Sequence, residues 1–372
     1  MASLTLVIKP VGNSCPLRCD YCYNSDPNLR QRHSSKTMSP GVLEKLLFEF
    51  FQVPQRKHVI IWHGGEPTVA GISFYENVLR LQKEMVKRFD IKGKVTNRIQ
   101  TSGVLIDEAW ANFLKVSGIK PGFSVDGPSI VHDAHRFYPD GHGSLSDTMS
   151  GVELLKSQGV RIGAGAVINK DSLNHPLEVF EFLRSHFTGF DFSPCFETVV
   201  EGNIPVYGIS AEEYASFVKT VFLHWWKIDD PTIRVKSFVR YVEAALGKAP
   251  KVCSMSSGCN RFLSVDGNGD VYPCGRFAGL PELCLGNITQ SSFEAIRATS
   301  MYQDYLSNAQ YMPKECQDCR WKFACNNGCT ALRYTEQGTF LPRSPLCEAI
   351  SDILDFVQNL VIETKEGEER KN

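Results

Sequence analysis

Short apolar runs alternate with amphipathic stretches through the first half of the chain. Runs rich in valine, isoleucine and phenylalanine predict buried strands, and apolar residues recurring every three or four positions predict helices. The expected strands are 4–10, 58–64, 95–103, 120–127, 160–169 and 190–197, and the expected helices between them are 39–51, 73–89, 107–118, 145–159 and 175–187. Strands alternating with helices form parallel βα units, so we expect an α/β fold. Periodicity alone does not choose between a barrel, a partial barrel and an open doubly wound sheet.

Polar or glycine-rich turns follow several of the expected strands. The sequences HGGEP, QTSG and SVDGP begin at His63, Gln100 and Ser124. In parallel α/β folds, ligands collect at the carboxyl ends of strands. We therefore expect these turns on the same face as the loop after the first strand, which carries cysteines in the spacing Cys-x3-Cys-x2-Cys.

The character of the chain changes in its last third. Residues 210–226 and 236–247 read as helices, whereas residues 253–347 hold nine of the 13 cysteines among short polar turns. A small region of this kind is expected to be held together by bound ligands more than by a large core. The charged tail, residues 363–372, is expected to be frayed.

Composition excludes several classes of protein. The chain has 372 residues, 42% of them hydrophobic, and a formal net charge of -1, so no global field attracts nucleic acid or an anionic membrane. Lys9 and Pro10 interrupt the stretch where a signal peptide needs apolar residues. No run approaches the roughly 18 apolar residues that span a bilayer. The sequence predicts a soluble, cytoplasmic protein without nucleic-acid or membrane partners.

The cysteines indicate metal chemistry. Disulfide scaffolds are typically short and secreted, whereas clustered cysteines in a cytosolic enzyme point to metal or redox sites. Eight thiols in the last third suffice for two four-cysteine sites, and structural zinc or inert buried cysteines are the alternatives. The three-cysteine loop in the same chain favours iron–sulfur clusters in both places. Cys195 and Cys284 remain outside these sets and are expected to be small buried hydrophobes.

Three cysteines are too few for a complete site. On a [4Fe–4S] cube they leave one iron without a protein ligand, and an open iron can bind a small chelating molecule. Tyr23, directly after the third cysteine, either offers a flat face to a purine or simply packs.

The ordered set of motifs resembles the radical SAM superfamily. In that family the amino and carboxylate groups of S-adenosylmethionine chelate the open iron, and the motif matching HGGEP contacts the methionine amino group. The C-terminal cysteine pattern resembles the SPASM domain, which binds two auxiliary clusters. The resemblance implies a partial (β/α)6 TIM-type barrel over residues 1–235, a SPASM domain with its preceding helical linker over 236–350, and a C-terminal helix and charged tail over 351–372. The implied cofactors are three [4Fe–4S] clusters and S-adenosylmethionine.

The resemblance also implies ligand sets. By this resemblance, the three cysteines of the first loop bind the open cluster. Eight further cysteines form two sets of four ligands, and the positions of the two sets interleave along the chain. These sets are Cys15, Cys19 and Cys22; then Cys253, Cys259, Cys274 and Cys329; then Cys316, Cys319, Cys325 and Cys347.

Other residues are candidates for contacts with S-adenosylmethionine. Two glycines allow close backbone approach, a carboxylate can accept a hydrogen bond from the amine, and strand-end polar residues either border the ribose or cap helices. An arginine can bind the methionine carboxylate or pair with Asp133 or Asp126. The candidates are Tyr23, Gly64, Gly65, Glu66, Pro67, Gln100, Ser102, Ser124, Asp126 and Arg136, whereas His63, His132 and His135 are expected to make ordinary hydrogen bonds.

Two groups of SPASM proteins are most similar. GrrM-like maturases crosslink an aromatic ring to a β-carbon of a precursor peptide, forming a cyclophane, and anaerobic sulfatase maturases convert Cys or Ser to formylglycine. In sulfatase maturases an Asp, proposed as general base, follows the cysteine matching Cys274, and here Gly275 stands there. The sequence therefore favours C–C crosslinking after Cβ hydrogen abstraction over formylglycine, epimerisation or thioether formation. Asp270, Arg276 and Glu282 are weak candidates for the base.

The expected partners are a precursor peptide and an electron donor such as a flavodoxin or ferredoxin. A non-catalytic iron–sulfur electron carrier is the alternative from a different class of function.

Overall fold

The computed structural model describes residues 3–24, 37–195, 207–335 and 337–369, so the end of the strand expected at 190–197 lies outside the described residues. Internal contacts divide the chain into two compact units, each built from separate segments. The first unit is Met1–Val125, His132–Gly163 and Cys259–Ser307, and the second is Asp126–Val131, Ala164–Gly258 and Asn308–Asn372.

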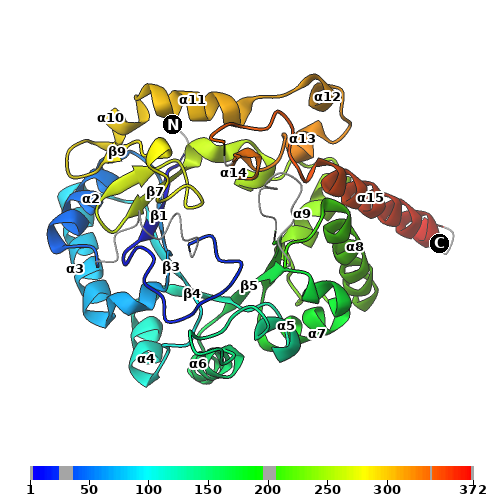
Figure 1. The fold of residues 1–372 in the computed structure, drawn as a ribbon, viewed down its shortest axis with the longest axis horizontal. Helices are drawn as coiled ribbons and strands as arrows, with labels where there is room; N and C mark the ends of the chain where they lie inside the picture. Colours follow the sequence, from blue (N-terminus) through cyan, green and yellow to red (C-terminus); the bar gives the residue numbers. More distant parts are fainter. Residues whose placement is uncertain (1–2, 25–36, 196–206, 336, 370–372) are drawn as a thin grey trace. The chain divides into compact units, whose positions relative to one another are not determined.

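The first unit contains a row of parallel strands (Figure 1). Their order is β4-β3-β2-β1, with β1 at Thr5–Lys9, β2 at Lys57–Trp62, β3 at Lys94–Thr101 and β4 at Lys120–Ser124. Inward side chains of neighbouring strands, such as Leu6, Ile60 and Trp62, expose none of their surface. Burial of such alternating apolar residues fixes the register, since a one-residue slip would turn them outward.

A strand from the cysteine-rich region extends this row. β7, Phe262–Asp266, pairs in parallel with β1 so that Lys9 lies opposite Asp266. β8, Asp270–Tyr272, and β9, Gly286–Asn287, continue outward in antiparallel pairing. The sequence pattern does not predict that residues 262–266 pair with the first strand.

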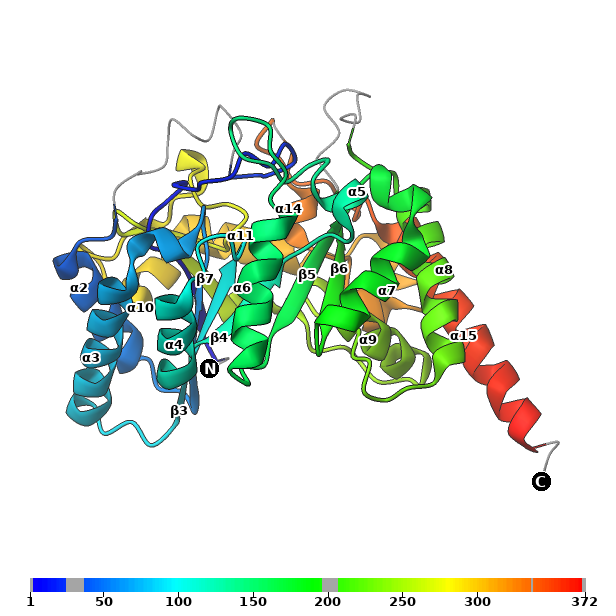
Figure 2. The ribbon, with the colours of Figure 1, turned by 90° about the horizontal axis from the view of Figure 1, so that it is seen from below.

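Helices cover the outer side of these strands, and Figure 2 shows α3, α4 and α6 standing next to one another. Pro40 begins α2 behind the Ser39 cap, and Asp107 caps α4, which ends at the left-handed Gly118. The bounds of the helices that lie wholly or mostly in the first unit are α2 Pro40–Gln52, η1 Pro67–Ala70, α3 Ile72–Arg88, α4 Glu108–Ser117, α6 Leu145–Ser157, η4 Gly258–Arg261, η5 Pro281–Leu283, α10 Phe293–Arg297 and α11 Ser300–Gln310. The short helix α5, Ser129–His132, belongs to the second unit except for its last residue.

The second unit packs helices on a parallel pair of strands. Its aromatic core includes Phe192 against Phe217 at 5.5 Å and Phe222 against Phe238 at 5.1 Å between ring centres. The last helix, red in Figure 1, packs against α8 and α9. The bounds are β5 Gly163–Ile168, η2 Asp171–Asn174, α7 Pro176–His186, β6 Phe190–Pro194, α8 Ala211–Ile228, α9 Lys236–Ala245, η3 Cys253–Met255, α12 Lys314–Gln317, α13 Lys322–Cys325, α14 Thr330–Arg333 and α15 Cys347–Glu369.

The structure confirms the α/β class and the alternation of strands and helices. It differs in the tail, because α15 continues to Glu369 where fraying was expected. Glu and Lys are good helix formers, so a helix anchored by its first turns can continue into such a tail. In the part of the chain that is described, no helix combines the length and the apolar character needed to cross a membrane.

Candidate functional site

The three-cysteine loop follows β1 and rests on the turn after β2. Gly65 N–H donates to the Gly12 carbonyl at 2.8 Å, and Glu66 N–H donates to the Ser14 carbonyl at 2.7 Å. A Cβ at Gly65 would lie 2.2 Å from the Ser14 carbonyl oxygen. The sequence predicts that Gly65 allows a ligand to approach the backbone closely. In the structure, the group that lies this close to Gly65 is the backbone of the cysteine loop.

A second segment holds the loop from the other side. Arg18 N–H donates to the Phe137 carbonyl at 2.7 Å, and His135 Nδ1 lies 3.0 Å from an Asp20 carboxylate oxygen. The Arg136 guanidinium lies over the Tyr21 ring, 5.3 Å from its centre. The loop is thus fixed by backbone and side-chain contacts, and the segment from His132 onward supplies them.

The thiols of the loop differ in exposure. Cys15 is exposed, Cys19 is buried and Cys22 is half-buried. Although Cys15 as a residue is exposed, burial of its thiol raises the pKa to about 12, and the negative charges of Glu66, Cys19 and Cys22 add to this. A bound cation or cluster stabilises the thiolate form. Thiols whose negative charges repel one another are therefore suited to bind such a group.

Glu66 is the best-connected candidate in the turn after β2. It exposes 1% of its surface. Its Oε1 accepts from the Thr68 backbone N–H and from the hydroxyls of Thr68 and Thr101, at 2.7–3.1 Å. Its Oε2 accepts from both the N–H and the hydroxyl of Ser102 at 2.7 Å. The carboxylate therefore ties the ends of β2 and β3 together.

Glu66→Gln is expected to lower the free energy of unfolding by about 2 kcal/mol. The amide nitrogen of glutamine cannot accept, so the buried N–H of Thr68 or of Ser102 loses its partner. Urea denaturation followed by circular dichroism measures this. Glu76→Gln, at an exposed position of α3, is the matched control and should change stability by less than about 0.5 kcal/mol. Equal stability of both variants would contradict the role of Glu66.

Other candidates lie at neighbouring strand ends. Gln100 Nε2 donates to the Ser124 hydroxyl at 3.0 Å, joining β3 to β4. Pro67 opens η1, and its carbonyl accepts from the Tyr75 hydroxyl at 2.8 Å. Asp126 belongs to the second unit, is fully buried, and accepts from the Val167 N–H at 2.9 Å.

A lysine in this unit is buried, which the sequence pattern does not predict. Lys9 ends β1 and exposes none of its surface. Its Nζ donates to Asn24 Oδ1 at 2.7 Å and lies 5.2 Å from the centre of the Tyr23 ring. Asn24 in turn donates to the Gly64 carbonyl at 3.0 Å. The only sequence signal is a charged residue at the end of an otherwise apolar strand.

The histidines make ordinary hydrogen bonds, as expected. His132 Nε2 lies 3.1 Å from the Ser144 hydroxyl, and His63 Nδ1 accepts from the Gly64 N–H at 2.8 Å. Burial and the nearby charge of Lys9 lower the pKa of His63 to about 4. His63 is therefore neutral near pH 7 and carries its proton on Nε2.

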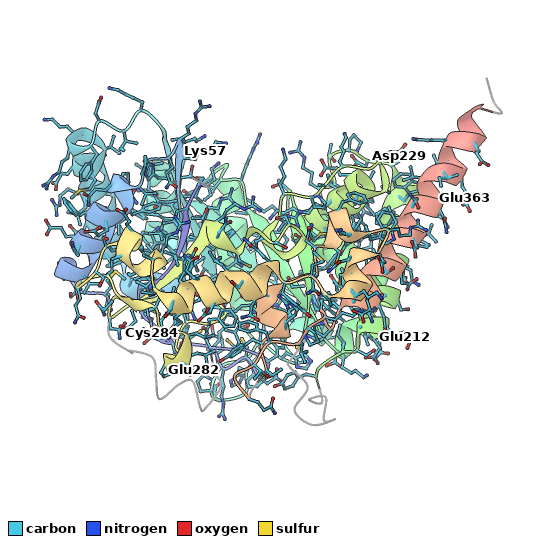
Figure 3. All side chains as sticks on the ribbon, turned by 90° about the horizontal axis from the view of Figure 1, so that it is seen from above. Lys57, Glu212, Asp229, Glu282, Cys284 and Glu363 are labelled. Carbon is cyan, nitrogen blue, oxygen red and sulfur yellow. The ribbon has the colours of Figure 1, made fainter. Side chains whose placement is uncertain are left out.

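The weak candidates for a base lie in and after β8. Asp270 accepts from the amides of Asn268 and Asn287, at 2.7 and 2.9 Å. Arg276 is exposed, and so is Glu282, which Figure 3 labels near Cys284. A Cβ at Gly275 would lie 3.2 Å from Val7 Cγ1, a tight contact that a small shift of the valine side chain would relieve.

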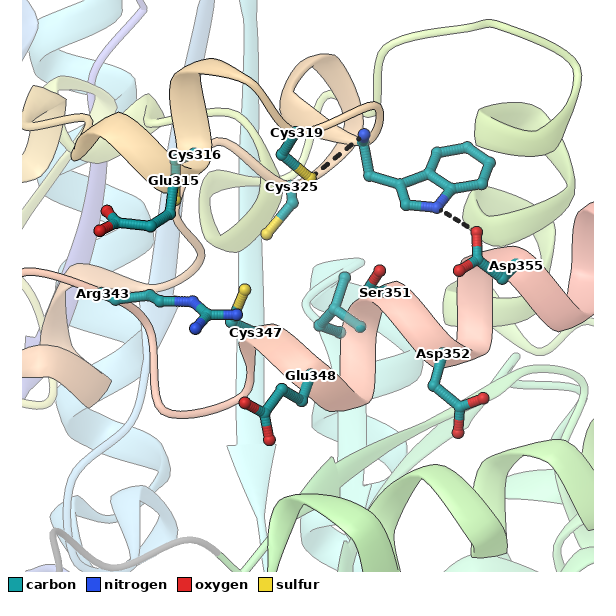
Figure 4. Close-up of a pocket in the computed structure, with 12 residues that line it drawn as sticks. Glu315, Cys316, Cys319, Cys325, Arg343, Cys347, Glu348, Ser351, Asp352 and Asp355 are labelled. Carbon is teal, nitrogen blue, oxygen red and sulfur yellow. Dashed lines mark hydrogen bonds between the residues drawn. The ribbon is translucent and has the colours of Figure 1, made fainter.

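The second unit contains a cavity of 390 Å³ lined by Cys316, Cys319, Cys325 and Cys347. Figure 4 shows the labelled sulfurs of Cys319, Cys325 and Cys347 around a common space. A hydrogen bond to Cys347 raises the pKa of Arg343, which lies at the same cavity. Among the described residues no group of three side chains converges on a point as ligands of a single metal ion do. Four thiols that line one cavity provide the donor set of a [4Fe–4S] cluster or of a zinc ion.

The other four-cysteine set is divided. Cys253 and Cys329 belong to the second unit, and Cys259 and Cys274 to the first. Cys195 directly follows β6 and is buried, whereas Cys284 is half-buried with its thiol 3.7 Å from the Gly286 carbonyl.

Comparisons with known proteins agree with this geometry. The model of the radical SAM superfamily matches residues 10–183, and the model of the SPASM iron–sulfur cluster-binding domain matches residues 253–320. A serine-type anaerobic sulfatase-maturating enzyme of Bacteroides thetaiotaomicron is 31% identical over 353 residues, covering 89% of this chain and 84% of the relative. The chain belongs to the radical SAM superfamily. This radical SAM enzyme also carries a SPASM domain, and its cofactors are S-adenosylmethionine and [4Fe–4S] clusters.

Further relatives share nearly the whole length of this radical SAM enzyme. A cysteine-type anaerobic sulfatase-maturating enzyme of Clostridium perfringens is 27% identical, covering 96% of both chains. The solved structure of native anSMEcpe with bound AdoMet and Cp18Cys peptide has a TM-score of 0.86 at 26% identity, covering 98% of this chain and 99% of the other. The comparisons confirm the expected fold and favour the sulfatase-maturase alternative over cyclophane formation.

Proposed function

We propose that this radical SAM enzyme oxidises the β-carbon of a Cys or Ser side chain in a peptide or protein substrate, forming formylglycine. The observation that carries the proposal is similarity over 84–96% of the length of sulfatase-maturating enzymes of both the serine and the cysteine type. A similar solved structure holds AdoMet and a peptide together, which supports a peptide substrate here as well.

The proposal assigns three [4Fe–4S] clusters to the cysteines. The loop after β1 offers three thiols, one fewer than the four irons of a [4Fe–4S] cluster require, and the cavity of the second unit is lined by four. Bound at the open iron, S-adenosylmethionine supplies a 5′-deoxyadenosyl radical that takes a hydrogen atom from an unactivated carbon. The ligand sets are those implied by the sequence, with residues 1–235 holding the first cluster and residues 236–350 the two auxiliary ones.

The chain's own residues hold and orient the reactants. Gly64 and Gly65 keep the β2 turn against the cysteine loop, and Glu66 fixes the strand ends. Tyr23, 39% exposed, packs against the adenine in this proposal. Gln100 and Ser124, already hydrogen-bonded to each other, border the ribose in this proposal. Such fixed placement keeps the target C–H near the radical carbon and excludes stray hydrogen donors.

The proposed oxidation removes two hydrogens from the substrate side chain in total. Removal of one hydrogen atom from the β-carbon, followed by one proton and one electron, converts Ser to an aldehyde directly. For Cys the same loss gives a thioaldehyde, which water hydrolyses with release of sulfide. An auxiliary cluster held by the cysteines of residues 253–347 would accept this electron, and a flavodoxin or ferredoxin would supply the electrons that the first cluster needs.

Cyclophane formation is the second candidate, and Gly275 favours it. Glycine cannot accept a proton where sulfatase maturases carry the proposed Asp base. Crosslinking begins with the same abstraction at a β-carbon, so both candidates use the same site.

Mass spectrometry of candidate peptides after anaerobic reaction tests the proposal. The substrates are a sulfatase-type peptide with Cys or Ser at its centre and the peptide encoded beside this gene. An aldehyde that reacts with a hydrazide probe supports formylglycine. Loss of two hydrogens without an aldehyde, with the joined residues kept together on fragmentation, would favour the cyclophane instead.

A simpler measurement separates an enzyme from an electron carrier. The reconstituted protein with reductant and S-adenosylmethionine should release 5′-deoxyadenosine, and about twelve irons per chain should be bound. Bound iron without release of 5′-deoxyadenosine would indicate an electron carrier. Two bound zinc ions per chain and no iron would contradict the proposed radical reaction.

A further inference from the structure

The buried lysine at the end of β1 has no place in the proposed chemistry. An ammonium group carries three N–H donors. The described contacts of Lys9 are one hydrogen bond to Asn24 and the face of the Tyr23 ring. A fully buried cation is costly, and an apolar side chain of similar length would fit the core better. A cation kept in such a place needs compensating negative charge.

Three negative groups of the first unit act on this ammonium. Asp266 lies opposite Lys9 in the β1–β7 ladder. Lys9 Nζ contacts Tyr23 and Asn24, the two residues that directly follow Cys22. Cys274 lies beside the same strand, because a Cβ at its neighbour Gly275 would lie 3.2 Å from Val7 Cγ1. Burial lowers the pKa of Lys9 to about 8, and negative charge on these three groups raises it in that order of strength. His63 and Arg276 also lie within reach of this group of charges.

Two of those three groups are cluster ligands in the proposed function, on which this step rests. Cys22 belongs to the open cluster and Cys274 to the first auxiliary cluster. We infer that Lys9 raises the reduction potentials of the clusters bound through Cys22 and Cys274. The Lys9 ammonium stabilises the additional negative charge that each cluster gains on reduction.

The physical basis is the weak screening of a buried charge. Reduction adds one electron, so a fixed cation nearby stabilises the reduced cluster more than the oxidised one. Net charge around a cluster is one of the factors that set its potential. Because Lys9 Nζ contacts Tyr23 and Asn24, which directly follow Cys22, the larger effect is expected on the three-cysteine cluster.

The test is a redox titration of the full-length reconstituted enzyme, followed by electron paramagnetic resonance without peptide. Lys9→Met removes the cation at similar length and should make reduction of the three-cysteine cluster at least tenfold less favourable, a shift of about 59 mV to more negative potential for one electron. Addition of S-adenosylmethionine identifies that cluster, since only its spectrum should change on binding. Lys57→Met, an exposed lysine at the start of β2, is the control and should not shift either potential.

A second variant must act in the opposite direction. Asp266→Asn removes a negative charge but keeps the side-chain oxygen that accepts from the Gly267 N–H at 2.8 Å. It should move the potential to more positive values. A general disturbance of the fold would shift both variants the same way, so equal directions would overturn the inference, as would an unshifted Lys9→Met enzyme with normal iron content.

If Lys9→Met fails to load iron, Lys9→Gln, which also removes the charge but can still donate to Asn24 Oδ1, decides alone: a negative shift supports the inference, and no shift or a positive one overturns it. A failure of the inference about Lys9 can be distinguished from a failure of the proposed function. The potentials are measured without peptide, so an enzyme that modifies no peptide leaves this result standing.

Discussion

Replacing Cys15, Cys19 and Cys22 together by alanine is expected to abolish 5′-deoxyadenosine formation, lowering its rate more than 100-fold. S-adenosylmethionine then has no iron to chelate, and no electron reaches its sulfonium. The iron content should fall by about four per chain while the auxiliary clusters remain. Iron analysis and chromatography of the reaction mixture measure both quantities.

Cys284→Ala is the matched control for this triple variant. Cys284 is half-buried, lies outside every proposed ligand set and should keep both iron and activity. If the triple variant still cleaved S-adenosylmethionine, or kept its full iron content, the open cluster would have to lie elsewhere in the chain.

Gly65→Ala is expected to be nearly as damaging, although it adds one methyl group. Gly65 has no left-handed φ, so alanine suits its backbone, and the effect is steric. The new Cβ would lie 2.2 Å from the Ser14 carbonyl oxygen and 2.6 Å from the Asn13 carbonyl carbon, both of them backbone atoms. Relief requires moving the cysteine loop. We expect a loss of about 3 kcal/mol in the free energy of unfolding and poor loading of the first cluster.

Gly41→Ala provides the contrast, because a Cβ at this position of α2 meets nothing within 4 Å. Alanine in a helix is favoured over glycine, so stability should be unchanged or rise by up to about 1 kcal/mol. Denaturation curves and iron content distinguish the two variants. A Gly65→Ala enzyme as stable and as iron-loaded as Gly41→Ala would mean that the two loops do not pack as described.

Local sequence pattern predicted the strands and helices well because the signal is local. Strands such as Lys57–Trp62 alternate buried and exposed side chains, and helices such as Glu108–Ser117 carry their own capping residues. The pairing of β7 with β1 has no such signal, since it joins residues from opposite ends of the chain.

The candidate site also has features that the sequence predicts and contacts that it does not. Motif spacing singled out Glu66 and the cysteines, but it did not reveal that Glu66 binds Thr101 and Ser102, or that Lys9 reaches Asn24. These contacts depend on how β2, β3 and the cysteine loop meet in space. The interleaved ligand set that includes Cys329 stays a prediction.

The parallel pairing of Thr5 with Phe262 has a consequence for synthesis of the protein on the ribosome. β1 is the first strand to leave the ribosome. The edge of β1 that pairs with β7 stays unpaired until nearly three quarters of the polypeptide has been translated. Exposed strand edges invite wrong pairing, and pairings between distant residues form slowly. Truncated chains that end before residue 262 should therefore aggregate or recruit chaperones, and insertion of the first cluster should await the arrival of that late strand.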